Sequence, residues 1–91
     1  MQQITLDASG WRDRADGFGA ILAALGAPDW HGANLDALLD SLRGGVNGVG
    51  PPFALTLTGL PAPLAGFGVA LFEVFAQAIS DGITVSLRLR P

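Results

Sequence analysis

Two carboxylates one helical turn apart are the side chains of this chain best placed to act together. Asp36 and Asp40 stand four residues apart in a stretch where leucines recur at helical spacing, so both fall on one flank of a predicted helix. Arg43 follows on that helix, and Trp30 and His31 precede it in a loop. Paired carboxylates suit acid–base catalysis or the binding of a basic protein.

A purely structural explanation of this pair is also open. Asp36 near the helix start would suit the helix dipole, Asp40 could pair with Arg43, and both carboxylates would then be solvated surface groups. Against this, two like charges four residues apart disfavour a helix slightly, whereas a cation at one of the two positions would favour it. The pair by itself leaves both explanations standing.

Enzymatic chemistry finds little support in the rest of the chain. The serines lack the context of a nucleophile, a single histidine cannot build a clustered metal site, and no glycine-rich phosphate loop follows a strand. A hydrolase using Asp36 and Asp40 is an open alternative, but exposed helix turns offer no cleft for a catalytic acid. We therefore expect a protein that is not an enzyme, without catalytic residues, metal or cofactor.

Composition predicts a small acidic domain. The 91 residues, with 49% hydrophobic and 14% charged side chains, suit one domain spanning residues 1–91. The net charge is −3, and the segment 29–40 contains three Asp and no Lys or Arg. Because an acidic surface attracts a basic protein and repels a phosphate backbone, we expect a basic protein partner and no direct nucleic-acid binding.

The sequence gives no sign of export or membrane insertion. It contains no cysteine, and its first residues lack the basic start and apolar core of a secretory signal. No apolar run approaches the ~20 residues that a membrane span needs. We therefore expect a cytoplasmic protein that does not contact a membrane; its oligomeric state is left open.

Hydrophobic periodicity predicts three strands and three helices. Strictly alternating segments predict strands at 4–7, 53–58 and 83–90. Helical patterns run around 14–25, 34–43 and 68–81, with Asn34 as the predicted N-cap of the second. The apolar residues expected to face the core from these helices are Phe18, Ile21, Leu22, Leu25, Leu35, Leu38, Leu39, Leu42, Leu71, Val74, Phe75 and Ala78.

The order of these elements predicts the sheet. Long helical connections between successive strands imply parallel neighbours. Strict alternation implies that one face of the sheet is bare, since parallel strands covered on both faces are apolar throughout. Right-handed crossovers that step one way place all helices on one side. The predicted fold class is α/β, a two-layer domain with a three-stranded parallel sheet in the order 1-2-3.

The stretch 28–42 resembles the signature of the barstar family, small intracellular inhibitors of secreted ribonucleases. Members of this family carry an aromatic-rich loop, a glycine, then Asn-hydrophobic-Asp-Ala-Leu, and a second Asp one turn later. The matching residues here are Pro28, Gly32, Asn34, Leu35, Asp36, Ala37, Leu38, Asp40 and Leu42. The resemblance implies the same two-layer, barstar-like fold.

The resemblance also implies unequal roles for the two carboxylates. Asp40 would enter the active site of a barnase-type ribonuclease where the substrate phosphate sits, and Asp36 would pair with a neighbouring cation. Trp30 aligns with an aromatic residue that contacts the nuclease in the family. An equally supported alternative is that Trp30 packs beneath its own loop. The predicted partner-binding residues are Trp30, His31, Gly32, Asn34, Asp36, Leu39, Asp40, Arg43, Gly44, Glu73 and Gln77.

Three positions depart from the family pattern. Leu39 and Gly45 stand where the family's ribonuclease inhibitor carries aromatics, and Gln77 replaces an acidic residue of the last helix, with Glu73 one turn earlier. The acidic pair is kept while the surrounding contacts differ, which favours a different nuclease or another basic target.

We therefore expect an immunity or antitoxin-like inhibitor that occludes the active site of a basic ribonuclease or similar toxin. The alternative is a non-inhibitory interaction module with the same fold. Such a module would use the polar sheet face around Thr56, Ser86 and Arg88, including for self-association.

Overall fold

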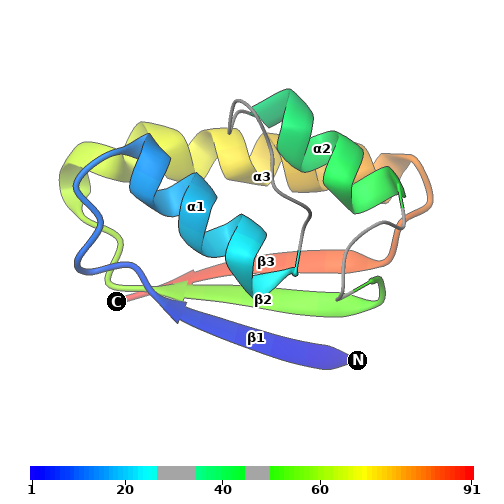
Figure 1. Cartoon of the computed structure of the whole chain (residues 1–91), viewed down its shortest axis with the longest axis horizontal. Coiled ribbons are helices and arrows are strands. Elements are labelled where there is room, and N and C mark those ends of the chain that lie inside the picture. The colour runs from blue at the N-terminus through cyan, green and yellow to red at the C-terminus, as the bar shows by residue number, and fades with distance from the viewer. Residues whose placement is uncertain (27–34, 45–49) are drawn as a thin grey trace.

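A computed structural model of the chain describes residues 1–26, 35–44 and 50–91 (Figure 1). Two helices separate the first two strands, and a 3-10 turn and one helix separate the last two. The elements are β1 (Gln2–Asp7), α1 (Arg14–Ala24), α2 (Leu35–Gly44), β2 (Phe53–Thr58), the 3-10 turn η1 (Ala62–Leu64), α3 (Ala65–Ser80) and β3 (Val85–Arg90).

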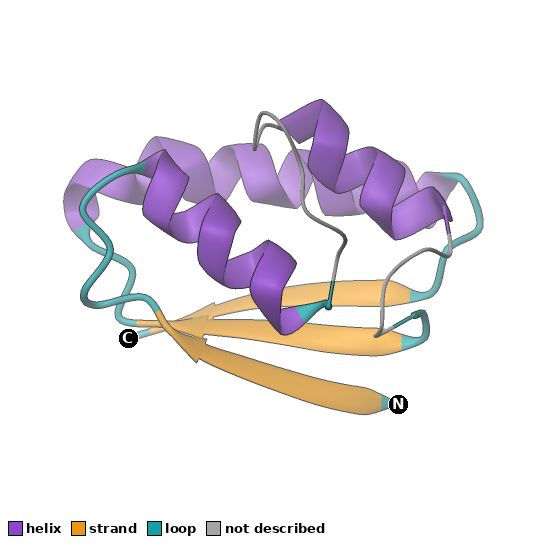
Figure 2. Cartoon of the chain, in the orientation of Figure 1, coloured by secondary structure: helices purple, strands orange, loops and turns teal. Residues whose placement is uncertain are grey.

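The three strands form one parallel sheet in the order β1-β2-β3, which confirms the predicted topology. Ile4, Leu55 and Leu87 lie side by side in the register and face the helices. Figure 2 places all three helices over the same side of the sheet. The predicted two-layer α/β fold with helices on one face is therefore confirmed.

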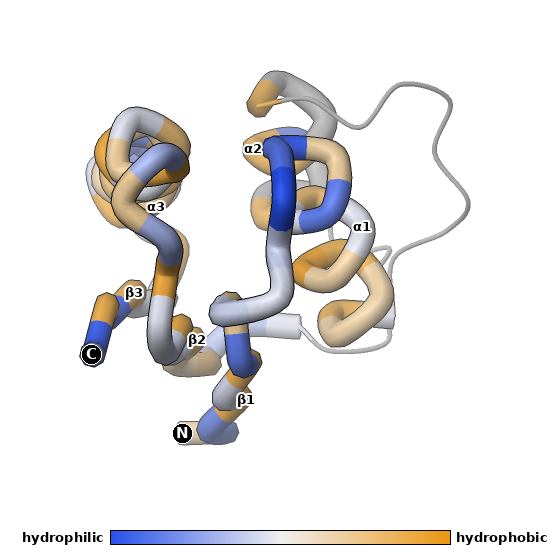
Figure 3. The backbone as a smooth tube through the Cα atoms, turned by 90° about the vertical axis from the view of Figure 1, so that its left-hand side faces the viewer, coloured by the Kyte–Doolittle hydropathy of each residue, from blue (hydrophilic) through white to orange (hydrophobic). Residues whose placement is uncertain are grey.

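The opposite face of the sheet carries polar side chains. Because side chains alternate along a strand, Thr5, Thr56 and Arg88 form one row on this face, and Asp7 and Arg90 flank the next row. Figure 3 shows the helices stacked above the strands, with none of the described helices below them. The alternation in the sequence thus correctly marked a sheet with one uncovered face.

Element boundaries differ from the prediction at the first strand, which begins at Gln2 instead of 4, and on both sides of the last helix. The helix begins at Ala65 instead of 68, because the turn η1 starts after Pro61 and leads directly into it. The following strand begins at Val85 instead of 83. Gly82 adopts a φ of 88°, and the Ile83 N–H donates to the Ala78 carbonyl at 3.0 Å, so this residue closes the helix end and does not pair in the sheet.

Buried apolar side chains from the helices and the sheet form one hydrophobic cluster. The predicted core positions of the helices are buried, except that Leu35 and Leu39 are half-buried at the edge of the cluster. Phe67 of α3 is 1% exposed and packs against α1. Its ring meets that of Phe18 edge-on, with the centroids 5.1 Å apart.

One sequence expectation is corrected here. By length and composition, the 19-residue segment Ala62–Ser80 is apolar enough to cross a membrane, contrary to the expectation that no such segment exists. Within the described fold, Leu71, Phe75 and Ala78 of this segment are buried in the protein core. A core helix meets this criterion because it must be apolar where it covers the sheet.

Candidate functional site

Helix α2 is fixed in its rotation by two leucines. Leu38 and Leu42 are 0% and 1% exposed, and both belong to the hydrophobic cluster. Asp40 lies midway between them in sequence, about 160° round the helix from each. It is exposed. Burial of the two leucines therefore turns the Asp40 carboxylate toward solvent, where a cationic partner can reach it.

Asp36, Arg43 and Gly44 also belong to α2 by the bounds of the helix. Asp36 stands one turn before Asp40 in the sequence, but its side chain and that of Arg43 lie outside the described part of the structure. The predicted supporting role of Asp36 and the alternative pairing of Asp40 with Arg43 stay predictions.

Four other predicted contact residues fall between α1 and α2. Trp30, His31, Gly32 and Asn34 lie outside the described residues, as does the predicted N-cap interaction of Asn34. Their roles stay predictions from the sequence.

Leu39 follows Leu38 in α2 and is half-buried against the hydrophobic cluster. Part of its side chain contributes to the core, and the remainder is accessible beside Asp40. A binding partner would meet only the exposed portion, so this position offers less contact area than a fully exposed side chain.

The other two predicted contact residues lie on α3, which packs against α2 (Figure 1). Glu73 and Gln77 are exposed, and their spacing of four residues places them in one row along the helix. The Gln77 amide Nε2 donates to Asp81 Oδ1 at 3.2 Å, so this side chain is oriented along its own helix. The candidate surface thus combines two adjacent helices.

The carboxylates at the start of α1 have structural partners. Asp13 is the N-cap and its Oδ1 accepts from the Asp16 N–H at 3.0 Å, while Asp16 Oδ2 accepts from the Arg12 N–H at 2.8 Å. The hydrogen bond from the Arg12 N–H lowers the pKa of Asp16, with a smaller contribution from the charge of Arg12. Hydrogen bonds from Ser9 likewise lower the pKa of Asp7. Some of the acidic residues that give the chain its negative charge therefore stabilise local structure.

Within residues 1–26, 35–44 and 50–91, no group of three His, Cys, Asp or Glu could hold a metal ion.

The sequence reasoning missed one surface feature, an apolar hollow between α3 and β3. It is lined by Gly59, Leu60, Pro61, Ala62, Ala65, Val69, Phe72, Leu89, Arg90 and Pro91. Its signal in the sequence is the second apolar face of the last helix, which remains once the core positions are assigned.

A protein-family model matches most of the chain. The model of a family described as Barstar (barnase inhibitor) matches residues 1–82, which include both predicted carboxylates and most of the sheet. No curated protein matches the chain.

Proposed function

This chain belongs to the barstar family, and from that membership we propose that it inhibits a basic ribonuclease or similar toxin protein by occluding the active site. The observation that carries the proposal is the exposed Asp40 on a helix whose rotation is fixed by buried Leu38 and Leu42. A carboxylate on a helix that is already fixed in place costs little backbone freedom on binding, which favours a tight complex. As an inhibitor, the protein would not be an enzyme.

The proposed mechanism is charge mimicry. A ribonuclease active site presents cationic side chains to the substrate phosphate, and the Asp40 carboxylate would accept hydrogen bonds from those same groups. Hydrogen bonds between ionised partners are shorter and stronger than neutral ones, and they gain further strength when the complex excludes water. Asp36 would pair with a neighbouring cation, while Trp30 and His31 would contact the rim of the nuclease site.

The net charge of −3 supports a fast encounter with a basic partner. Leu39, Gly45 and Gln77 determine which partner that is, because they replace two aromatic contacts and one acidic contact of the family's ribonuclease inhibitor. We propose a target nuclease whose surface around the active site differs from that of barnase.

We further propose that residues 1–91 act as one domain in the cytoplasm. The single hydrophobic cluster joining helices and sheet supports the first part. The absence of cysteine is compatible with the second.

The test of the proposal is binding to the target nuclease with Asp40 changed to Ala. Loss of a central charged contact should weaken binding by about 2 kcal/mol or more. The association rate of the unchanged protein should fall as salt is raised from about 0.05 M to about 0.5 M, because exposed charges are screened. Equal affinity of the two proteins would refute the role of Asp40.

A second candidate rests on the uncovered polar sheet face. Thr56 and Arg88 are neighbours in the sheet register, and Ser86 lies two residues before Arg88 on the same strand face. A non-inhibitory module using this face would lose its partner when Arg88 is changed to Glu. Asp40→Ala would leave that binding intact.

A further inference from the structure

β3 forms an outer edge of the sheet, and part of its backbone faces away from the other strands. The Gly59 N–H donates to the Arg90 carbonyl at 2.9 Å, so Arg90 turns its backbone groups toward the end of β2. Because this direction alternates along a strand, Leu87 and Leu89 turn their N–H and C=O groups the other way. Among the described strands β3 has only β2 as a neighbour, so these groups are open to a further strand.

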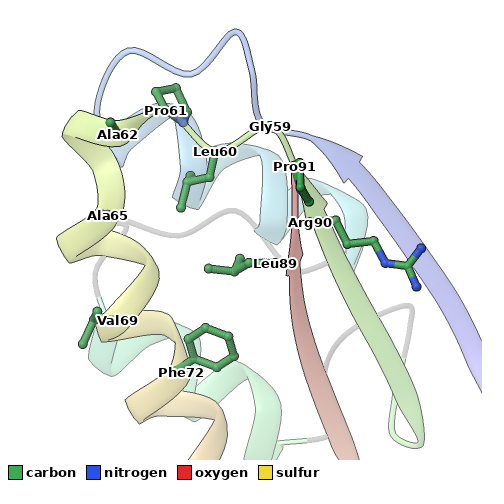
Figure 4. Close-up of a pocket in the computed structure, with 10 residues that line it drawn as sticks. All are labelled: Gly59, Leu60, Pro61, Ala62, Ala65, Val69, Phe72, Leu89, Arg90 and Pro91. Carbon is green, nitrogen blue, oxygen red and sulfur yellow. The ribbon is translucent and has the colours of Figure 1, made fainter.

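The side chains of β3 alternate between two different surroundings. Figure 4 shows Leu89 turned toward α3 and Arg90 turned the opposite way, onto the bare face of the sheet. Leu87 faces the helices like Leu89, and it packs against the hydrophobic cluster. Arg88 lies on the bare face in register with Thr56. The edge therefore has an apolar side and a cationic side.

The cationic side of this edge is not neutralised within the described structure. Arg88 and Arg90 are exposed, and neither forms an ion pair with a described residue, whereas Arg12 pairs with Asp16. Asp7 is the carboxylate on the bare face of the described strands, but it lies on β1, two strand spacings or about 10 Å from β3. Since that distance exceeds the Debye length of about 8 Å at physiological ionic strength, its charge is largely screened.

We propose that β3 binds an extended acidic segment of a partner protein as a fourth strand of the sheet. The backbone of the segment pairs with the N–H and C=O groups of Leu87 and Leu89, which is the recognition mode of strand addition. Its carboxylates stand at alternate positions on the bare face, about 7 Å apart, and each lies across from Arg88 or Arg90. The residues between them are apolar, because they lie beside Leu87 and Leu89.

Charge favours an acidic segment at this edge and disfavours a second copy of the chain. On the bare face, β1 carries Gln3, Thr5 and Asp7, so its edge offers no cation and one repelling carboxylate. Two β3 strands paired with each other would set arginines opposite arginines, which is unfavourable. An acidic segment is therefore favoured at β3 over β1, and it is favoured over self-pairing.

Phosphate groups are the other anions that a pair of arginines can bind. An RNA strand, however, has no backbone that pairs with the N–H and C=O groups of a protein strand. The residues of β1, β2 and β3 on the bare face also include no aromatic side chain on which a base could stack. Both observations favour a protein segment over RNA.

A peptide with blocked ends in which glutamate and valine alternate is the probe for this edge, and about nine residues suffice to pair along β3. Nuclear magnetic resonance of the labelled protein follows its binding through individual N–H groups. Those of Leu87 and Leu89 should exchange with solvent more slowly when the peptide is bound. Those of Ser86 and Arg88 face β2 in both states and should change little. A peptide with lysine in place of glutamate should bind at least about tenfold more weakly, since like charges then face each other.

Arg88→Glu reverses one charge at the edge and should weaken peptide binding at least about fivefold. Arg14→Glu is the matched control, because it makes the same change at an exposed position of α1. Equal weakening by the two variants would mean that only the net charge matters, which would overturn the proposal. Asp40→Ala should leave peptide binding unchanged, so the inference goes beyond the proposed inhibition and does not depend on it.

Two methylated peptides test the strand pairing itself. One carries a single N-methyl group on a valine near its centre, and the other carries it on the adjacent glutamate. Only one of these N–H groups faces β3, the valine in an antiparallel segment and the glutamate in a parallel one. Loss of binding with one of them supports strand addition and assigns its direction, whereas equal affinity of the two methylated peptides would contradict it.

Two other results would overturn the proposal. A single-stranded oligouridylate that binds in place of the peptide, and loses affinity when Arg88 is changed to Glu, would assign the arginines to a phosphate backbone. A protein that binds neither would show that Arg88 and Arg90 serve to keep other strands away from the edge, as charged side chains do on many edge strands.

Discussion

Asp16 and Asp40 are both carboxylates on helices, and their surroundings give them different tasks. Asp16 accepts a hydrogen bond from the Arg12 N–H at 2.8 Å, and its own N–H donates to Asp13, so its charge holds the start of α1. Asp40 lies opposite two buried leucines and points to solvent in the middle of α2. The first is a structural acid, whereas the second is placed to meet a partner.

The hydrogen bonds around Asp16 predict a pH dependence of stability. Its pKa is lower in the folded protein than the ordinary value of 3.8, so the ionised form favours folding. This contribution is fully present above pH ~4 and is lost as the pH falls through the lowered folded pKa. Asp16→Asn should therefore show a shallower loss of stability between about pH 4 and pH 2 in denaturant unfolding.

Glu73→Gln is the control for that experiment, since it removes one exposed carboxylate without touching the start of α1. It should keep the acid sensitivity of the unchanged protein. If Asp16→Asn and Glu73→Gln lost stability with the same pH profile, the hydrogen bonds at Asp16 would have no part in acid unfolding.

At the site, sequence reasoning predicted the exposed carboxylate but not the environment of its neighbour. Helical spacing alone placed Asp40 away from the leucine stripe, and the structure agrees. The same spacing assigned Leu39 to the core, whereas the resemblance to the barstar family assigned it to the partner surface. Its half-buried state depends on how α2 packs against α3, and this tertiary contact cannot be predicted from a local sequence pattern.

At the scale of elements, the contact between α1 and α3 depends on a glycine. A Cβ on Gly17 would collide with Cε2 of Phe67, whose ring also packs against Phe18 and Trp11. The guanidinium carbon of Arg14 lies 5.9 Å from the centroid of the same ring. Gly17 thus allows Phe67 to fill the space under α1, although glycine is a poor helix former.

Replacing Gly17 by Ala should destabilise the protein by about 1–3 kcal/mol, because the added methyl group overpacks the core against Phe67. Gly19→Ala is the matched control in the same helix, where nothing lies within 4 Å of the added Cβ. That variant should be more stable by about 0.5–1 kcal/mol, since alanine favours helix. Chemical denaturation measures both, and a gain in stability at Gly17 would refute the packing account.

The sheet order and the covered face were predictable because each follows from the alternation of side chains and the hand of the crossovers. The ends of α3 were not. Its start depends on a 3-10 turn after Pro61, and its end on a hydrogen bond from Ile83 to Ala78. A few capping interactions determine both ends of α3, and hydrophobic periodicity does not predict such interactions.

At the scale of the whole molecule, the fold separates three surfaces. α2 presents Asp40, the sheet presents the polar row that includes Arg88, and the outer side of α3 presents the exposed apolar side chains of Val69, Phe72 and Ile79. Since only the α2 surface takes part in the proposed inhibition, substitutions on the other two surfaces should leave nuclease binding unchanged. Arg88→Glu is expected to leave inhibition within about twofold of the unchanged protein, as an exposed charge remote from the contact contributes little.

An RNA-cleavage assay with a panel of small basic ribonucleases tests the central claim most directly. We predict that one member loses activity in proportion to added protein and is fully inhibited at equimolar amounts. Asp40→Asn should lose this inhibition, whereas Asp7→Asn, an equal charge change on the opposite face of the sheet, should retain it. Inhibition that survives Asp40→Asn, or a target nuclease that binds the protein and still cleaves RNA, would contradict the account.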